Sequence, residues 1–207
     1  EGTQVAGSAL WTCIKLMNLP LGLATASLLV FSDFLNLGFA AACVSHMHGR
    51  EPNSNSSLRQ LFAWPGWPKV SRLLLYGWCA SILAAKLVGL LPTSPQQADL
   101  ETALIIEQAV AGGWAARSLA VVSTVVLGPA AEELFHRGVL LPRLASYMPR
   151  WAAMAVPAML FTLAHESLYP QRTLHNLVYD ALYFSTGSLW PSFLLHATWN
   201  AYCLICS

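Results

Sequence analysis

Long apolar runs, separated by short polar segments, dominate the hydropathy pattern of this chain. The first run covers residues 19–44 and is interrupted by Asp33 and Asn36, and the second covers residues 70–91. A helix needs about 20 residues to cross about 30 Å of hydrocarbon, and both runs reach that length. The loop between them, residues 46–69, is rich in Asn, Ser and Pro. The pattern therefore predicts two transmembrane helices in the N-terminal half.

A different pattern follows the second run. Ser94 and Gln97 have the spacing of a capping box, which predicts the start of a helix. The segment 95–111 places acidic residues on one side and apolar residues among its other positions. We interpret it as an amphipathic helix at the membrane interface that ends at Gly112 and Gly113.

The rest of the chain contains further apolar segments of helical length. We expect the first of them to break near Gly128 and Pro129, because proline lacks the N–H that a helix interior requires. The whole pattern predicts an all-α, polytopic integral membrane bundle of about seven or eight helices. The predicted segments are 114–147, 151–165, 173–185 and 189–205.

The composition agrees with a membrane protein. Hydrophobic residues make up 56% of the chain and charged residues 10%, whereas soluble domains carry about 25% charged residues. Mean hydropathy is +0.51. The net charge is only +1 and no basic tract is present, so we expect membrane lipid, and no nucleic acid, as a partner. No long linker divides the chain, so we predict one membrane-embedded domain over residues 1–207.

Ionisable side chains inside apolar segments are costly in lipid and often mark functional sites. The densest group lies in residues 128–138 and contains Glu132, Glu133 and Arg137. Glu133 and Arg137 are four residues apart, so they share a helix face and can pair. Glu132 is turned about 100° away and stays available to act as a general base. The alternative interpretation is an ordinary ion pair at a helix end.

Two more pairs have the same four-residue spacing. Phe161 and His165 share one helical face, and so do His196 and Asn200. A His and an Asn that project together can donate two hydrogen bonds to one oxygen, as an oxyanion hole requires. The alternatives are a structural histidine and hydrogen bonding between packed helices. No Ser or Cys has the local signature of a known nucleophilic triad, so the set favours activation of water.

The three motifs EExxxR, FxxxH and HxxxN, in this order on apolar helices, resemble the CPBP family. That family comprises the type II CAAX prenyl proteases and the bacteriocin-processing or Abi proteins. The resemblance covers about residues 121–201, within a motif-bearing core of about residues 114–206. His136 stands where the family often has an aromatic residue.

The resemblance implies an intramembrane fold of eight helices and a glutamate-dependent endopeptidase. Glu132 would be the base that activates water, with help from His165. Glu133 and Arg137 would orient that base.

The same resemblance implies how a substrate is handled. His196 and Asn200 would stabilise the tetrahedral oxyanion, and Phe161 would help to position the substrate. The substrate would be a polypeptide cleaved near the membrane surface, which in the best-known members happens just after a prenylated cysteine.

A zinc site is the alternative to a metal-free mechanism. Glu132, His165 and His196 are residue types that can form a three-ligand catalytic zinc site. The sequence contains no HExxH pair, and the resemblance favours a mechanism without metal. We therefore expect no metal and no cofactor.

A second class of function is a non-proteolytic scaffold, an assembly factor or a subunit of a larger membrane complex. The eight Trp residues would suit contacts with partner helices, and the motifs would then persist in a pseudoenzyme. A transporter is a third hypothesis, although no repeat symmetry supports it.

The TGSLW sequence at residues 186–190 resembles bacterial and plastid members. We therefore expect a bacterial inner membrane or an organellar membrane, such as the plastid thylakoid, rather than the endoplasmic reticulum.

Overall fold

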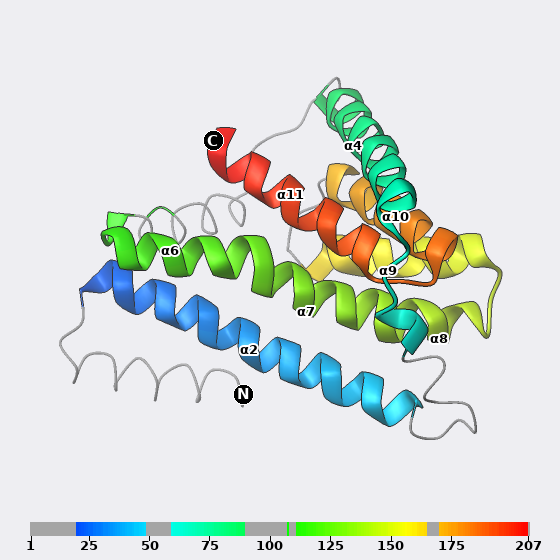
Figure 1. Cartoon of the computed structure of the whole chain (residues 1–207), viewed down its shortest axis with the longest axis horizontal. Helices are drawn as coiled ribbons and strands as arrows, with labels where there is room; N and C mark the ends of the chain where they lie inside the picture. Colours follow the sequence, from blue (N-terminus) through cyan, green and yellow to red (C-terminus); the bar gives the residue numbers. More distant parts are fainter. Residues whose placement is uncertain (1–19, 49–58, 90–106, 108–110, 165–169, 207) are drawn as a thin grey trace.

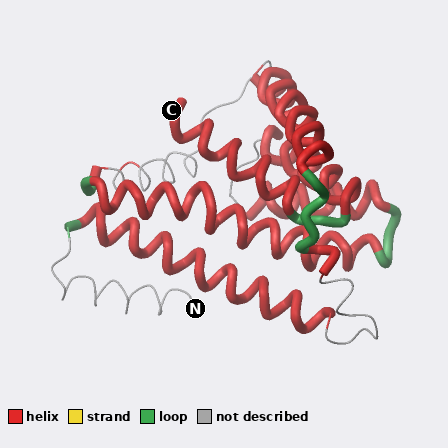
Figure 2. Tube along the Cα trace, viewed as in Figure 1, coloured by secondary structure: helices red, strands yellow, loops and turns green. Residues whose placement is uncertain are grey.

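The computed structural model describes residues 20–48, 59–89, 107, 111–164 and 170–206. Within this part of the chain every regular element is a helix, joined to the next by loops and turns (Figure 2). The predicted all-α fold class is therefore confirmed. The amphipathic helix expected at residues 95–111 lies outside the described residues, apart from positions 107 and 111.

Three of the described helices are long and apolar enough to cross a membrane, judged by length and composition. They extend over Leu21–Met47, Trp67–Leu87 and Trp114–Ala145. The first two correspond to the apolar runs predicted at 19–44 and 70–91. The boundaries differ by a few residues, because turns of polar side chains continue a helix beyond its apolar part.

The C-terminal half contains shorter helices in the order that the sequence predicted. Outside the long central helix, the described residues form α2 (Leu21–His48), α4 (Trp67–Gly89), α9 (Arg150–Ala164), α10 (Pro170–Thr186) and α11 (Trp190–Cys206).

The long central helix, Trp114–Ala145, does not break at Gly128 and Pro129, so that prediction was wrong. It begins after Gly113, whose positive φ of 92° suits a glycine. Two π-helical segments lie within it and widen the helix without ending it. Its parts are α6 (Trp114–Val122), η1 (Ser123–Leu127), α7 (Gly128–Phe135), η2 (His136–Leu140) and α8 (Leu141–Ala145).

The physical reason is the hydrogen-bond register before each proline. In η1 the N–H of Gly128 donates to the carbonyl of Ser123, five residues back. The next carbonyl, that of Thr124, would then face Pro129, which has no N–H to give. Because of the π turn, the Thr124 carbonyl receives no hydrogen bond from the helix backbone and is available to another donor. The second π segment likewise ends two residues before a proline, Pro142.

The helices form two groups that α11 joins. In Figure 1, α2 lies alongside the central helix, and α4, α9 and α10 gather on the other side of it. Small residues line the contact of α2 with α6, where Ala26, Ala116 and Ala120 are buried. Small side chains let membrane helices approach closely. Helix α11 packs against α4 and α10 as well as against η1 and α7, so its side chains reach the interior of the whole bundle.

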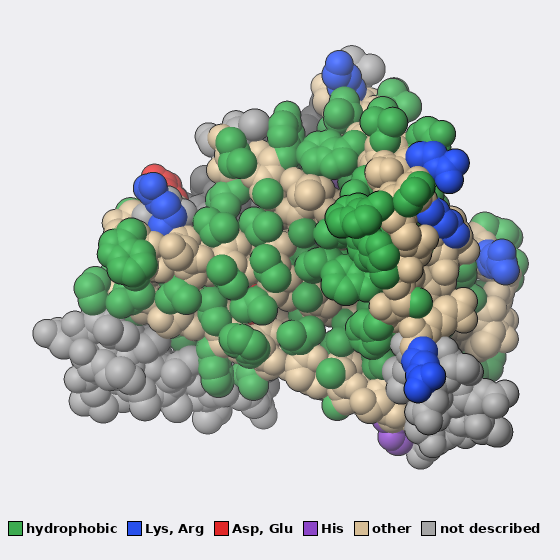
Figure 3. Space-filling view, in the orientation of Figure 1, with side chains coloured by type: hydrophobic (Ala, Val, Ile, Leu, Met, Phe, Trp, Pro, Cys, Tyr) green, Lys and Arg blue, Asp and Glu red, His purple; other side chains and the backbone are tan. Residues whose placement is uncertain are grey.

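The outside of the bundle is apolar. Hydrophobic side chains are spread over the described part of the face in Figure 3, and the few Lys and Arg side chains lie towards its edges. Large apolar residues are exposed on both long N-terminal helices, for example Phe34 at 57% on α2 and Tyr76 at 66% on α4. A surface of this kind is soluble in lipid rather than in water. Together with three helices of spanning length, it defines an integral membrane protein.

Candidate active site

A buried ion pair forms the centre of the polar interior. Arg137 Nη1 lies 3.1 Å from Glu133 Oε1, and both side chains are only 1% exposed. The pairing predicted from their four-residue spacing is therefore confirmed. It survives the change from α7 to η2, because the guanidinium extends back along the helix to the preceding turn.

Helix α10 completes the surroundings of Arg137. Arg137 Nε donates to Asp180 Oδ1 at 2.8 Å, and Arg137 Nη2 donates to the Asn176 side-chain oxygen at 2.9 Å. The ring of Tyr179 lies against the guanidinium, with its centroid 5.5 Å from Cζ. The arginine therefore binds one carboxylate of its own helix and one of a neighbouring helix, and it ties the two helices together.

Sequence reasoning missed these α10 residues. Asn176 and Asp180 are four residues apart in a segment that was predicted to be an apolar helix. This is the same spacing that drew attention to the other pairs, so the signal was present. It was not used because no motif contains the two residues.

His196 of α11 connects the two adjacent glutamates. Its Nδ1 lies 3.0 Å from Glu133 Oε1, and its Nε2 lies 3.6 Å from Glu132 Oε2. An ionised carboxylate can only accept, so Nδ1 carries the hydrogen of the shorter contact. The imidazole also stacks on Tyr179, with centroids 5.0 Å apart and an interplanar angle of 21°. These contacts fix the position of the ring and direct Nε2 towards Glu132.

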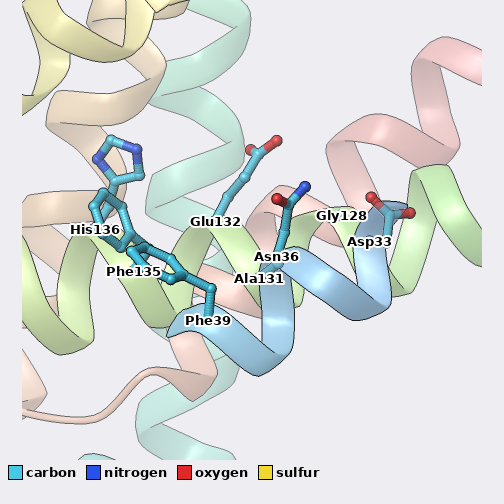
Figure 4. A pocket seen from close by; sticks show the side chains of 8 residues that line it. All are labelled: Asp33, Asn36, Phe39, Gly128, Ala131, Glu132, Phe135 and His136. Atoms are coloured by element: carbon cyan, nitrogen blue, oxygen red, sulfur yellow. The ribbon is translucent and has the colours of Figure 1, made fainter. Parts of the chain in front are cut away.

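The two glutamates have opposite environments. The Glu133 side chain is 1% exposed, whereas that of Glu132 is 34% exposed. Glu132 lines an open pocket of about 270 Å³ between α2 and the central helix. Figure 4 shows its carboxylate extending away from the helix axis, on the side where the amide of Asn36 also extends. The lining residues are Asp33, Asn36, Phe39, Gly128, Ala131, Glu132, Phe135 and His136.

The α2 residues of this pocket were seen in the sequence but were not assigned to a site. Asp33 and Asn36 appeared only as polar interruptions of a predicted span. Their contact with the motif-bearing helix depends on how α2 packs against α7, which residue spacing does not encode. His136, the departure from the family pattern noted above, lies in the same pocket.

Asn200 is held by the carbonyl that Pro129 leaves without a helical donor. Its Nδ2 donates to the Thr124 carbonyl at 3.0 Å. His196 and Asn200 thus both contact the central helix, as expected for two residues on one face of α11. Within the part of the chain that the structure describes, the second N–H of this amide has no acceptor, so it can serve a ligand.

The remaining two candidate residues are on or after α9. Phe161 lies within α9, but its side chain is not among those described, and His165 lies outside the described residues. Two of the three side chains of the zinc alternative, Glu132 and His196, approach each other at 3.6 Å, and the third is this same His165.

The fold and the site together define a class: an integral membrane protein whose helices surround a polar centre of carboxylates, arginine and histidine, beside an open pocket. Residues 113–202 match the family model described as "Type II CAAX prenyl endopeptidase Rce1-like". The segment from Gly113 to Tyr202 is therefore similar to a domain of that kind, and the resemblance to the CPBP family is confirmed over this segment. The comparisons with curated proteins and with solved structures found no match.

Proposed function

We propose that this protein is an intramembrane endopeptidase of the CAAX prenyl protease type, in which Glu132 activates water. The observation that carries the proposal is the contrast between the adjacent glutamates. Glu133 is sealed against Arg137 and His196, while Glu132 faces the pocket within 3.6 Å of the same imidazole. A carboxylate in such a position can exchange a proton with a bound molecule.

The proposed reaction is a direct hydrolysis. Glu132 takes a proton from water, and the resulting hydroxide oxygen attacks the carbonyl carbon of the scissile peptide bond. The oxyanion that forms accepts hydrogen bonds from His196 Nε2, which donates when the imidazole carries a proton on both ring nitrogens, and from the second N–H of Asn200. The C–N bond then breaks, and Glu132 returns the proton to the leaving amine. By resemblance, His165 assists Glu132 and Phe161 positions the substrate.

Glu133 and Arg137 have an orienting role in this scheme. Glu133 Oε1 binds both the guanidinium and His196 Nδ1, so it fixes the imidazole from the side opposite Glu132. Carboxylates often orient a working histidine in this way. The substrate class that fits is a polypeptide with a prenylated cysteine near its C-terminus, which would be cleaved at the membrane surface. The TGSLW segment supports a bacterial inner membrane or a plastid membrane as the location.

The test is a cleavage assay on the detergent-purified full chain with a quenched fluorescent peptide that ends in a farnesylated CAAX sequence. Glu132→Gln should lower kcat by about 10²- to 10⁴-fold, the usual contribution of a general base. The matched control is Glu107→Gln, the same exchange at an exposed position outside the site, which should cleave like the wild type. Cleavage by Glu132→Gln at the wild-type rate would contradict the proposal.

Two further results separate the alternatives. Full activity in a chelator is expected for a metal-free mechanism, whereas loss of activity that zinc restores would favour the zinc site. If the wild type cleaves no peptide and purifies in fixed ratio with other membrane proteins, the result favours a scaffold or assembly factor over a protease.

A further inference from the structure

Two polar side chains on α2 need an explanation. Asp33 and Asn36 lie in the middle of the candidate span Leu21–Met47. The two residues before Asn36 face outwards, with Phe34 57% exposed and Leu35 55% exposed. Polar groups at this depth are costly unless they have a partner or a function. Helix α2 also precedes the part of the chain that matches the family model, so the family motifs do not account for these residues.

Asp33 is explained by a contact within the protein. The hydroxyl of Ser123, the first residue of η1, donates a hydrogen bond to Asp33 Oδ2. The carboxylate therefore fastens α2 to the central helix at the point where the π-helical segment begins.

Asn36 has no such contact among the described residues. Its side chain is exposed and lines the pocket that Glu132 also lines. In Figure 4 the Asn36 amide and the Glu132 carboxylate extend from their two helices towards the same side. Asn36 thus forms one wall of the pocket and Glu132 another.

The chemistry of a carboxamide suits one kind of ligand group in particular. It offers an N–H donor and a C=O acceptor side by side, which matches the C=O and N–H of a peptide backbone. A peptide that enters a low-dielectric pocket loses water from these groups and needs such partners. A pocket of about 270 Å³ is at the small end of ligand sites, so it accommodates a short extended segment.

We propose that Asn36 binds the backbone of the polypeptide substrate and holds it opposite Glu132. This inference rests on the proposed function, because it assigns a substrate-binding wall to the same pocket. It adds a substrate-binding residue from α2. Since the contact is to the backbone, it orients the chain without selecting for side chains.

The experiment measures peptide binding separately from cleavage. The Glu132→Gln variant in detergent serves as the starting protein, because it should not cleave the peptide during the measurement. Its Kd for a fluorescein-labelled, farnesylated CAAX peptide is measured by fluorescence anisotropy. Adding Asn36→Leu, a change of similar volume, should weaken binding about tenfold, as expected for loss of one to two hydrogen bonds. The matched control is Ser32→Leu, which also replaces an exposed polar side chain of α2 by leucine but lies outside the pocket lining. It should change Kd less than twofold.

Cleavage kinetics give a second readout. With Glu132 intact, Asn36→Leu should raise KM about tenfold and change kcat little, because the backbone contact is present before and during the reaction. Equal peptide affinity with and without Asn36→Leu, whether both are tight or both are undetectable, overturns the inference. Binding that depends on Asn36 in a protein that never cleaves would instead refute the proposed function and leave Asn36 as a peptide-binding residue.

Discussion

The two sides of the central helix use the same residue types for different purposes. On the α10 side, Glu133, Arg137 and Asp180 are each 1% exposed, and the arginine pairs with both carboxylates. On the α2 side, Glu132 and Asn36 line an open pocket. The adjacent glutamates of one motif therefore divide into a carboxylate that builds the site and a carboxylate that faces the ligand.

This difference follows from helix geometry and from the neighbours of each face. Consecutive residues on a helix point about 100° apart, so only one of two adjacent glutamates can face α10. That face receives α10 and α11 and is sealed, while the next face receives α2, whose contact leaves a pocket. This division predicts that removing the shared counter-charge of the sealed side mainly lowers stability, and that removing a polar group that lines the pocket mainly lowers activity or binding.

The largest effect is expected for Arg137→Met. The substitution leaves Glu133 and Asp180 buried without their shared counter-charge, and breaking a buried pair in this way costs about 3–5 kcal/mol. Thermal unfolding of the purified protein in detergent should show a large drop in midpoint, or no folded protein should be recovered. Glu132→Gln is the comparison, since it neutralises a carboxylate of the same motif on the pocket side.

The division would be wrong if the two variants behaved alike. Arg137→Met that unfolds at the wild-type temperature would mean that the sealed side contributes little to stability. Glu132→Gln that unfolds as early as Arg137→Met would mean that the pocket-side carboxylate is also a structural group.

Much of the fold could be predicted because apolar length is a direct signal. The runs that became α2 and α4 are long enough to span a membrane, and nothing in the packing had to be known to find them. The expected break at Pro129 failed for a local reason. Sequence rules treat an interior proline as a helix end, but the π turn of η1 shifts the hydrogen-bond register and lets Asn200 use the spare Thr124 carbonyl.

The site could be predicted only as far as residue spacing describes it. The Glu133–Arg137 pair lies on one helix, so its four-residue spacing was enough. The contacts of Arg137 with Asp180, and of Asp33 with Ser123, join residues that are 43 and 90 positions apart. Such contacts depend on how whole helices pack, and one sequence without that packing does not reveal them.

An intermediate effect on activity is expected for Asp180→Asn. The amide oxygen can still accept from Arg137 Nε, and Arg137 then balances Glu133 alone. The free energy of unfolding should therefore change by less than about 1 kcal/mol, in contrast to removal of the arginine. Because Asp180 acts through Arg137 and Glu133 on His196, kcat should fall several-fold while KM stays the same.

Asp180→Asn is informative because a purely structural role would not produce that pattern. If kcat and KM are both unchanged, Asp180 only ties α10 to the central helix. If the variant is as unstable as Arg137→Met, then the negative charge of Asp180, and not only its hydrogen bond, is needed for the stability of the sealed side.

The smallest effect on activity and binding is expected for Ser123→Ala, which removes a contact between two helices beside the pocket. The hydroxyl of Ser123 fastens α2 by its hydrogen bond to Asp33, and losing one hydrogen bond to a charged group costs about 1.5–3 kcal/mol. Asp33 is only partly buried, so water can replace the donor, and we expect about 1 kcal/mol. The unfolding midpoint should fall slightly, and peptide Kd should stay within twofold of the wild type.

The matched control is Ser32→Ala, which removes a hydroxyl from α2 outside the pocket and should leave both values unchanged. A Ser123→Ala protein with normal stability but much weaker peptide binding would reverse the assignment, since Asp33 would then serve the ligand and Asn36 would have to be explained in another way.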